Sequence, residues 1–435
     1  MAWARAIASG RPVCSIKSPK KRHVTRLRVG FFYASNRKQR PAGGESARPE
    51  HQENTEIMKL RIAAGLACAG LSASAFAQSS VTLYGIVDTG IEYVSHANAA
   101  GDSVVRMPGI TGEMPSRWGV RGSEGLGGGW STIFALESGF NMRGGTLNQG
   151  GRLFGRQAWV GMSSPYGSLT FGRQYTMTFW AIADADLLGP DIYGGTASFD
   201  QYLPSSRSDN TVVYKGSYGG FTLGATWSFG RDSAGTGNSP GQGTCAGPVP
   251  GSAQSCREWS AMLRYDRNGY GVAAAWDEQH GGPGAAANLY DGTPTFALTN
   301  PGDTDVRIQL NGYGHVGALR IGGGWLGRRV DTVSAETPNV HTDQFYLTAQ
   351  YPVTAAFIVD GGVYHIVNSD HDTRGTIAAL RSTYQLSKRS AVYLQGAYLW
   401  NSAKAAYTVS QGGGGTTPAP GAGQLGIMAG IRHSF

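Results

Sequence analysis

The stretch MAGIRHSF (428–435) is informative about the fold because its side chains alternate in character. Successive side chains of a β-strand point to opposite faces, so every second residue shares a face. One face is mainly apolar and holds Ile427, Ala429, Ile431, His433 and Phe435. The other holds Met428, Gly430, Arg432 and Ser434. The last residues of a soluble domain are usually polar and frayed, so the pattern predicts that Phe435 belongs to a strand.

The same two-residue period recurs throughout residues 78–435, where no long amphipathic helix is indicated. Most segments are close to the ~9–11 residues that a tilted strand needs to cross a bilayer. The predicted strands lie near 81–93, 117–121, 130–137, 152–163, 168–175, 207–216, 221–229, 258–266, 270–280, 304–315, 319–330, 343–351, 356–366, 375–385, 390–400 and 424–435.

The connections between these strands alternate in length without a break. Short turns occupy 124–129, 164–167, 218–220, 266–269, 315–317, 352–355 and 386–389. Long loops occupy 95–115, 141–151, 174–206, 230–257, 281–302, 331–342, 367–374 and 401–423. A soluble sandwich or propeller would not explain this alternation, which is typical of an outer-membrane barrel. Because lipid offers no hydrogen-bond partners, such a sheet must close on itself. We therefore expect an all-β, 16-stranded antiparallel transmembrane β-barrel with short periplasmic turns and long extracellular loops, whose last strand pairs with the first near Val81 to Tyr93.

The N-terminal part predicts export and carries most of the positive charge. Residues 58–77 combine a basic start, an apolar run and the cleavage pattern Ala75-Phe76-Ala77, as in a signal peptide of the Sec pathway. Residues 1–57 are either a mis-called start or a disordered presequence, which leaves 78–435 as the barrel. Of 37 basic and 29 acidic side chains, 14 and 4 precede residue 78, which leaves 23 and 25. The barrel segment therefore has no basic excess for nucleic acid.

Two cysteines remain after the predicted leader, Cys245 and Cys256, in the loop sequence CAGPVPGSAQSC. A cysteine pair that closes a short loop in an exported protein is a disulfide candidate. The loop has no His, Asp or Glu between the two cysteines. A metal site is therefore not expected there.

Several stretches resemble the general trimeric porins of Gram-negative outer membranes, most closely those of beta-proteobacteria. These stretches are SSVTLYGIVDTGIEY (79–93), SRWGVRGSEGLGGGW (116–130), GRLFGRQAWVGMSSPYGSLTFGRQY (151–175), SRSDNTVVYKG (206–216) and GIRHSF (430–435). The resemblance implies a homotrimeric channel for passive diffusion of small hydrophilic solutes and ions, narrowed by a third loop folded into the lumen. It also implies contact with outer-membrane lipid and lipopolysaccharide. The barrel-assembly machinery would read the C-terminal signal formed by Ile431, His433 and Phe435.

Candidate pore residues of positive charge follow from strand parity and from the resemblance. Parity places Arg117 and Arg121 on one face, opposite Trp118 and Val120, and so toward the lumen. The resemblance places a basic ladder on Arg117, Arg156 and Arg207, with Arg121 beside it. Simple alternation would turn Arg156 outward, so either a bulge near Gly155 reverses the register or Arg156 lies at the rim and reaches inward.

Candidate acidic residues lie in the third long loop, which contains Asp184, Asp186 and Asp191. The resemblance places Asp186 and Asp191 at lumen-facing positions opposite the arginines, which would create a transverse field in a narrow aqueous slot. Asp88 and Glu137 also point inward by parity. The four arginines outnumber the three loop aspartates, which weakly favours the passage of anions. The inward carboxylates of Asp88 and Glu137 nearly cancel this excess of positive charge.

The sequence motifs do not form a complete catalytic arrangement. The G-x-S-x-G match GNSPG (237–241) lies in a Gly/Pro loop and lacks the strand and helix of a nucleophile elbow. Asp370-His371-Asp372 is better explained as a solvated loop than as a metal site. We therefore expect a channel without a cofactor and no enzyme. The alternative is an outer-membrane barrel that acts mainly as a surface receptor or adhesin.

Overall fold

The computed structural model describes residues 79–199, 206–231, 245–334, 339–410 and 414–435. The chain divides into two units, Met1–Ser72 and Ala73–Phe435, and all described residues belong to the second. The expected presequence, the signal peptide and the GNSPG match lie outside the described residues.

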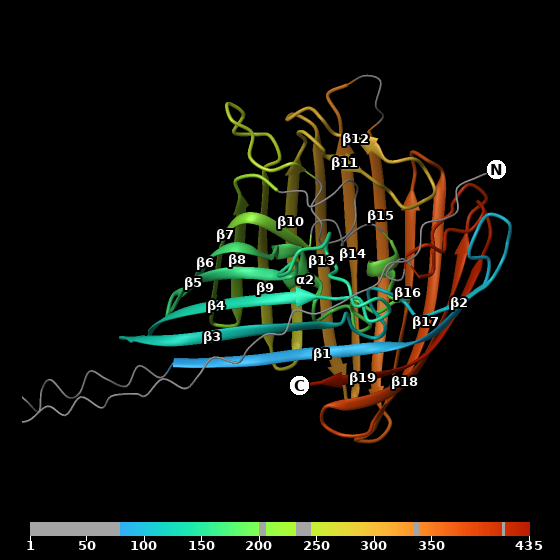
Figure 1. The fold of residues 1–435 in the computed structure, drawn as a ribbon, viewed down its shortest axis with the longest axis horizontal. Helices are drawn as coiled ribbons and strands as arrows, with labels where there is room; N and C mark the ends of the chain where they lie inside the picture. Colours follow the sequence, from blue (N-terminus) through green and yellow to red (C-terminus); the bar gives the residue numbers. More distant parts are fainter. Residues whose placement is uncertain (1–78, 200–205, 232–244, 335–338, 411–413) are drawn as a thin grey trace, which may run out of the picture. The chain divides into compact units, whose positions relative to one another are not determined.

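Within the described residues, one antiparallel sheet contains 17 strands, of which β2 (Val104–Arg106) has only 3 residues. The other sixteen are β1 (Ser79–Val94), β3 (Arg117–Gly127), β4 (Trp130–Gly139), β5 (Gln157–Ser164), β6 (Gly167–Tyr175), β7 (Arg207–Tyr218), β8 (Phe221–Ser228), β9 (Glu258–Arg267), β10 (Tyr270–His280), β13 (Thr304–Val316), β14 (Leu319–Asp331), β15 (Val340–Pro352), β16 (Phe357–Asn368), β17 (Thr373–Gln385), β18 (Ser390–Asn401) and β19 (Gln424–Ser434). Each pairs with the next along the chain, as Figure 1 shows. The predicted number and order of strands are confirmed.

The sheet closes where β1 meets β19. Their antiparallel register aligns Ile86 with Ser434 and Val94 with Gly426. One residue further, the Gly85 N–H donates to the Phe435 carbonyl at 3.2 Å, and the Phe435 N–H donates to the Gly85 carbonyl at 3.1 Å. The predicted pairing of the C-terminal strand with the first strand is confirmed.

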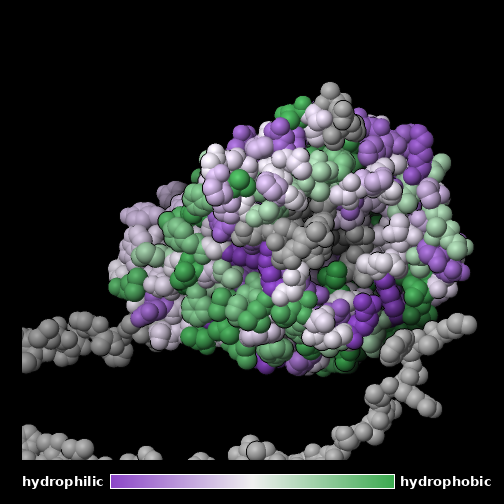
Figure 2. Space-filling view, turned by 45° about the horizontal axis from the view of Figure 1, so that its top comes forward, coloured by the Kyte–Doolittle hydropathy of each residue, from purple (hydrophilic) through white to green (hydrophobic). Residues whose placement is uncertain are grey.

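The two faces of the sheet differ in polarity as the alternation predicts. On the outer face Val81 is 69% and Leu83 61% exposed, although both are apolar. On the inner face of the same wall, Asp88 and Glu137 are each 4% exposed. Hydrophobic side chains form broad patches on the visible wall, and hydrophilic ones gather nearer the loops (Figure 2). This distribution suits a wall with lipid outside and polar groups inside.

Turn chemistry explains the tight end of the barrel. Asn268 and Gly269 connect β9 to β10 and have φ values of 54° and 84°. Two consecutive residues with positive φ form the type I′ turn, whose twist matches that of antiparallel strands. At the opposite end, Cys245 and Cys256 are joined by a disulfide with Cα atoms 5.5 Å apart. Both cysteines are fully buried, and a short two-stranded ribbon, β11 (Ala286–Ala287) and β12 (Phe296–Ala297), lies in the neighbouring loop.

The described helices are short and lie between β6 and β7. They are α2 (Met177–Ile182), with 6 residues, and α3 (Gly195–Ser198), with 4. In the described part of the chain, no helix combines the length and apolar character needed to cross a membrane.

Candidate functional site

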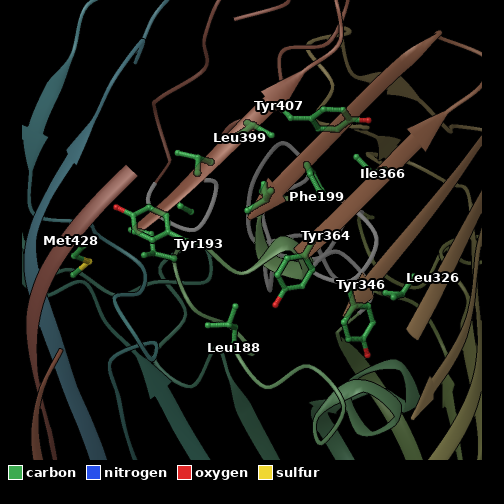
Figure 3. Packing of buried hydrophobic residues seen from close by; sticks show 14 of the residues in the cluster. Leu188, Tyr193, Phe199, Leu326, Tyr346, Tyr364, Ile366, Leu399, Tyr407 and Met428 are labelled. Carbon is green, nitrogen blue, oxygen red and sulfur yellow. The ribbon is translucent and has the colours of Figure 1, made fainter. Parts of the chain in front are cut away.

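The connection from β6 to β7, here called the third loop and described for 176–199 and 206, packs against inward-facing side chains of the barrel. Met177 and Ala181 of α2 lie in an apolar cluster with Val213, Met262 and Ala275 of the wall. The following segment packs on the far wall in a larger cluster, shown in Figure 3, that includes Leu188, Tyr193, Phe199, Leu326, Tyr346, Tyr364, Ile366, Leu399 and Met428. Burial of these apolar groups holds the loop inside the barrel.

The three aspartates of the third loop hold it to the wall. Asp184 pairs with Arg264 at 2.6 Å and with Arg320 at 3.5 Å. The Asp186 carboxylate accepts hydrogen bonds from the Tyr364 hydroxyl at 2.6 Å and the Thr196 hydroxyl at 2.5 Å. Each of these contacts uses a carboxylate oxygen, so the carboxylates of Asp184 and Asp186 are bound by other side chains of the protein.

Asp191 is held by Arg381 of β17, at 2.9 Å. Asp186 and Asp191 are only 4% and 1% exposed, whereas the sequence predicted carboxylates that face an open slot. In the structure both carboxylates lie against protein partners, Tyr364 and Arg381, on strands far along the chain. Asp184, whose side chain is 46% exposed, is the only one of the three that reaches water substantially.

Arg381 is a structural residue that the sequence reasoning missed. It makes two hydrogen bonds to the Asp360 carboxylate, at 2.9 and 2.7 Å, in addition to its bond with Asp191. Glu113 approaches the same guanidinium at 3.9 Å and also pairs with Arg432 at 3.4 Å. Strand parity gave one available signal, since Arg381 is a single charged residue at an inward position of β17.

The predicted basic residues Arg117, Arg156 and Arg207 come together around Glu137 and Tyr175. Arg156 donates to Glu137 at 2.6 Å and to the Tyr175 hydroxyl at 2.8 Å. Arg117 lies 3.8 Å from Glu137. Arg207 donates to the Tyr175 hydroxyl at 3.1 Å and places its guanidinium over that ring. Two cations therefore share one carboxylate, and a third binds the Tyr175 hydroxyl beside it.

The structure places Arg156 directly before β5, next to the Glu137 carboxylate. The β5 strand begins at Gln157 and not near 152, and its register with β4 contains no bulge. Arg156 therefore lies just before the strand, at its rim, and reaches inward. Its backbone N–H still donates to the Glu137 carbonyl at 3.1 Å, and its side chain reaches the Glu137 carboxylate on the inner face.

Arg121 differs from the other arginines because it is exposed and, among the described residues, has no ion pair. Its guanidinium carbon lies 5.1 Å from the centre of the Tyr84 ring. Asp88, by contrast, is enclosed and accepts hydrogen bonds from the Tyr393 hydroxyl at 2.6 Å and the Met114 N–H at 2.8 Å.

The Asp370-His371-Asp372 stretch is not organised around a common point. His341 contacts Asp370 at 3.2 Å, whereas His371 contacts Asp291 of another loop at 2.8 Å. Burial alone would raise the pKa of Asp291, but hydrogen bonds from Thr293 and His371 outweigh it and hold that pKa below its ordinary value. Among the described residues, no group of three or more His, Cys, Asp or Glu side chains is arranged to hold a metal.

A closed antiparallel barrel with polar groups inside, apolar groups outside and a loop packed within its lumen is the architecture of an outer-membrane channel. The chain belongs to the Gram-negative porin family, whose profile matches residues 63–404. It is therefore a protein of the Gram-negative outer membrane, and its family and fold indicate a channel and not an enzyme.

Similar proteins cover most of the chain. An outer membrane porin protein of Bordetella pertussis is 32% identical over 382 residues, which is 79% of this chain and 95% of the relative. Outer membrane porin protein 32 of Delftia acidovorans is 28% identical and covers 85% of this chain and 98% of its own length. The solved anion-selective porin from Comamonas acidovorans superimposes with a TM-score of 0.66 at 25% identity, over 82% of this chain and 100% of its own.

Proposed function

We propose that this porin forms a water-filled channel for passive diffusion of small hydrophilic solutes and ions, with a preference for anions. The observation that carries the proposal is the excess of arginines beside the third loop, where Arg117 and Arg156 share the single Glu137 carboxylate and Arg121 has no ion pair among the described residues. Asp186, Asp191 and Glu137 are buried in contacts with the protein, whereas Arg121 is exposed and the Arg117 side chain is 17% exposed.

Electrostatics turns this difference into a preference for anions. A carboxylate that lies against a guanidinium forms a nearly neutral pair, whose field decays quickly in water. A cation without such a partner keeps its full field in the aqueous slot, and charged groups that line a pore set its selectivity. We infer that Arg117, Arg121, Arg156 and Arg207 form the basic side of the constriction. Asp184 supplies the weaker acidic side between Arg264 and Arg320.

The similar porin from Comamonas acidovorans supports this reading because it is anion-selective. We further propose that the working channel is a homotrimer in lipid and lipopolysaccharide, inserted by the barrel-assembly machinery. Closure of a single inserted channel in three equal steps would support the trimer, and one step would contradict it.

The reversal potential across a planar bilayer with a KCl gradient tests the preference. We expect chloride to permeate more readily than potassium, and Arg207→Ala to lower the chloride-to-potassium ratio. Removing about 0.5–1 kcal/mol of attraction corresponds to a decrease of roughly two- to fivefold. Arg374→Ala, at the exposed start of β17, is the matched control and should leave the ratio unchanged.

Two results would count against the proposal. A wild-type protein that prefers potassium would contradict the anion preference but not the channel. A correctly folded protein that conducts no ions would contradict the channel itself.

A further inference from the structure

A cavity of about 420 Å³ lies in the wall formed by β1, β3, β4 and β5. Its lining includes Tyr84, Arg121, Ile133, Gln157 and Trp159. Volumes of roughly 300–1,000 Å³ are typical of small-molecule sites, and a cavity of about 150 Å³ is enough to hold benzene. The space is therefore adequate for a small organic solute.

Strand register places this cavity on the lumen side. Arg121 is opposite Ala135, which is in turn opposite Trp159. Ala135 is two residues from Glu137, so these side chains share the inner face with Glu137. The Tyr84 hydroxyl donates to Glu137 at 2.9 Å, so the cavity adjoins the basic group of Arg117 and Arg156. A solute that passes these arginines toward the short-turn end would meet the cavity next.

Among the residues that line the cavity, Arg121 alone is charged. It is exposed, and no ion pair engages it within the described chain. Arg117 and Arg156 differ, because both already contact Glu137. Arg121 can therefore bind a carboxylate through two parallel N–H donors without losing an existing ion pair.

The remaining walls are aromatic and aliphatic. The Trp159 indole N–H is already used, because it donates to the Gln157 side-chain oxygen at 2.9 Å. The half-buried indole ring therefore offers mainly its apolar surface, together with Ile133 and Ala135. Aromatic rings favour offset-stacked or edge-to-face partners over aliphatic ones of similar area.

From these features we propose that the cavity is a binding site for aromatic monocarboxylates on their way through the channel. Arg121 binds the carboxylate, and Trp159 and Tyr84 contact the ring. The inference rests on the proposed channel function and deepens it by naming a class of solute. Electrostatic attraction by the basic lining alone would act equally on acetate and benzoate. A preference for benzoate would therefore distinguish binding at this site from general attraction of anions.

Transient block of the chloride current tests the site, with benzoate, acetate and benzyl alcohol added in turn to the bathing solution. We expect benzoate to block at lower concentrations than acetate, and neutral benzyl alcohol to block least. Trp159→Leu should weaken the benzoate block by about three- to tenfold relative to the acetate block of the same variant, the size of one aromatic contact. Arg121→Gln should remove the preference of benzoate over benzyl alcohol.

Matched controls lie outside the cavity. Trp276→Leu changes an indole on the outer face, where Trp276 is 37% exposed, and Arg374→Gln changes an exposed arginine near the loops. Both should keep the wild-type ratio of benzoate to acetate block. Equal block by benzoate and acetate in a chloride-conducting wild type would overturn the site and leave the channel proposal intact. The site would also be overturned if Trp159→Leu kept the same ratio of benzoate to acetate block as Trp276→Leu. Absence of any conductance would instead overturn the channel proposal.

Discussion

Arg381→Met should destabilise the barrel and loosen the third loop more than any other single substitution of a wall arginine. Arg381 is 5% exposed, and its guanidinium contacts Asp191, Asp360 and Glu113. Methionine preserves much of the apolar stem but leaves three buried carboxylates without their shared cation. Removing one partner of a buried ion pair costs about 3–5 kcal/mol, so we expect a clear decrease in thermal stability.

Two measurements separate the global and local effects of this substitution. Thermal unfolding of the detergent-solubilised protein reports stability, and open-channel current noise reports motion of the loop. Arg389→Met, in the exposed turn after β17, is the control and should change neither. Arg381→Lys should recover only part of the loss, because lysine cannot form the bidentate contact to Asp360. Unfolding and noise equal to those of wild type would refute the role assigned to Arg381.

Deletion of Phe435 should reduce the yield of assembled barrels while leaving the conductance of each assembled channel unchanged. The deletion removes both backbone hydrogen bonds to Gly85 at the seam between β1 and β19. It also removes a ring packed directly over Gly85, where an added Cβ would lie 2.3 Å from the ring. Two hydrogen bonds and a partly buried ring together contribute about 2–4 kcal/mol. The lumen lies on the other face of the strand, so ion flow should not change.

The heat-resistant folded fraction on a denaturing gel measures assembly, and planar-bilayer recording measures conductance. Phe435→Ala is an informative companion because it removes the ring but keeps the backbone hydrogen bonds, and its yield should fall between wild type and the deletion. A wild-type yield for the deletion would show that the seam does not depend on Phe435. A changed unit conductance would show that the deletion reaches the lumen.

The barrel could be predicted from the sequence because strand periodicity and turn length are local properties. A strand of 11 residues such as β19 shows its two faces within its own sequence. Closure then follows, because an open edge is not tolerated in lipid. Only details at strand ends escaped prediction, such as the start of β5 at Gln157.

The candidate site was less predictable because its contacts join distant parts of the chain. Arg117 and Arg156 pair with Glu137, and Arg207 binds Tyr175, but nothing in the local sequence shows which partners these arginines take. Asp191 and Arg381 are separated by 190 positions. No local pattern distinguishes a carboxylate that anchors a loop from one that lines a pore.

The packing of the third loop has a mechanical consequence for the barrel. A wall one residue thick is easily flattened, and the third loop connects distant sectors of that wall by apolar packing near Met262 and by charge at Arg381. It therefore connects distant parts of the wall and resists changes in the shape of the barrel's cross-section. We expect lateral pressure from the surrounding bilayer to deform that cross-section least at the level of the third loop. The channel would then be stiffest where the third loop narrows it.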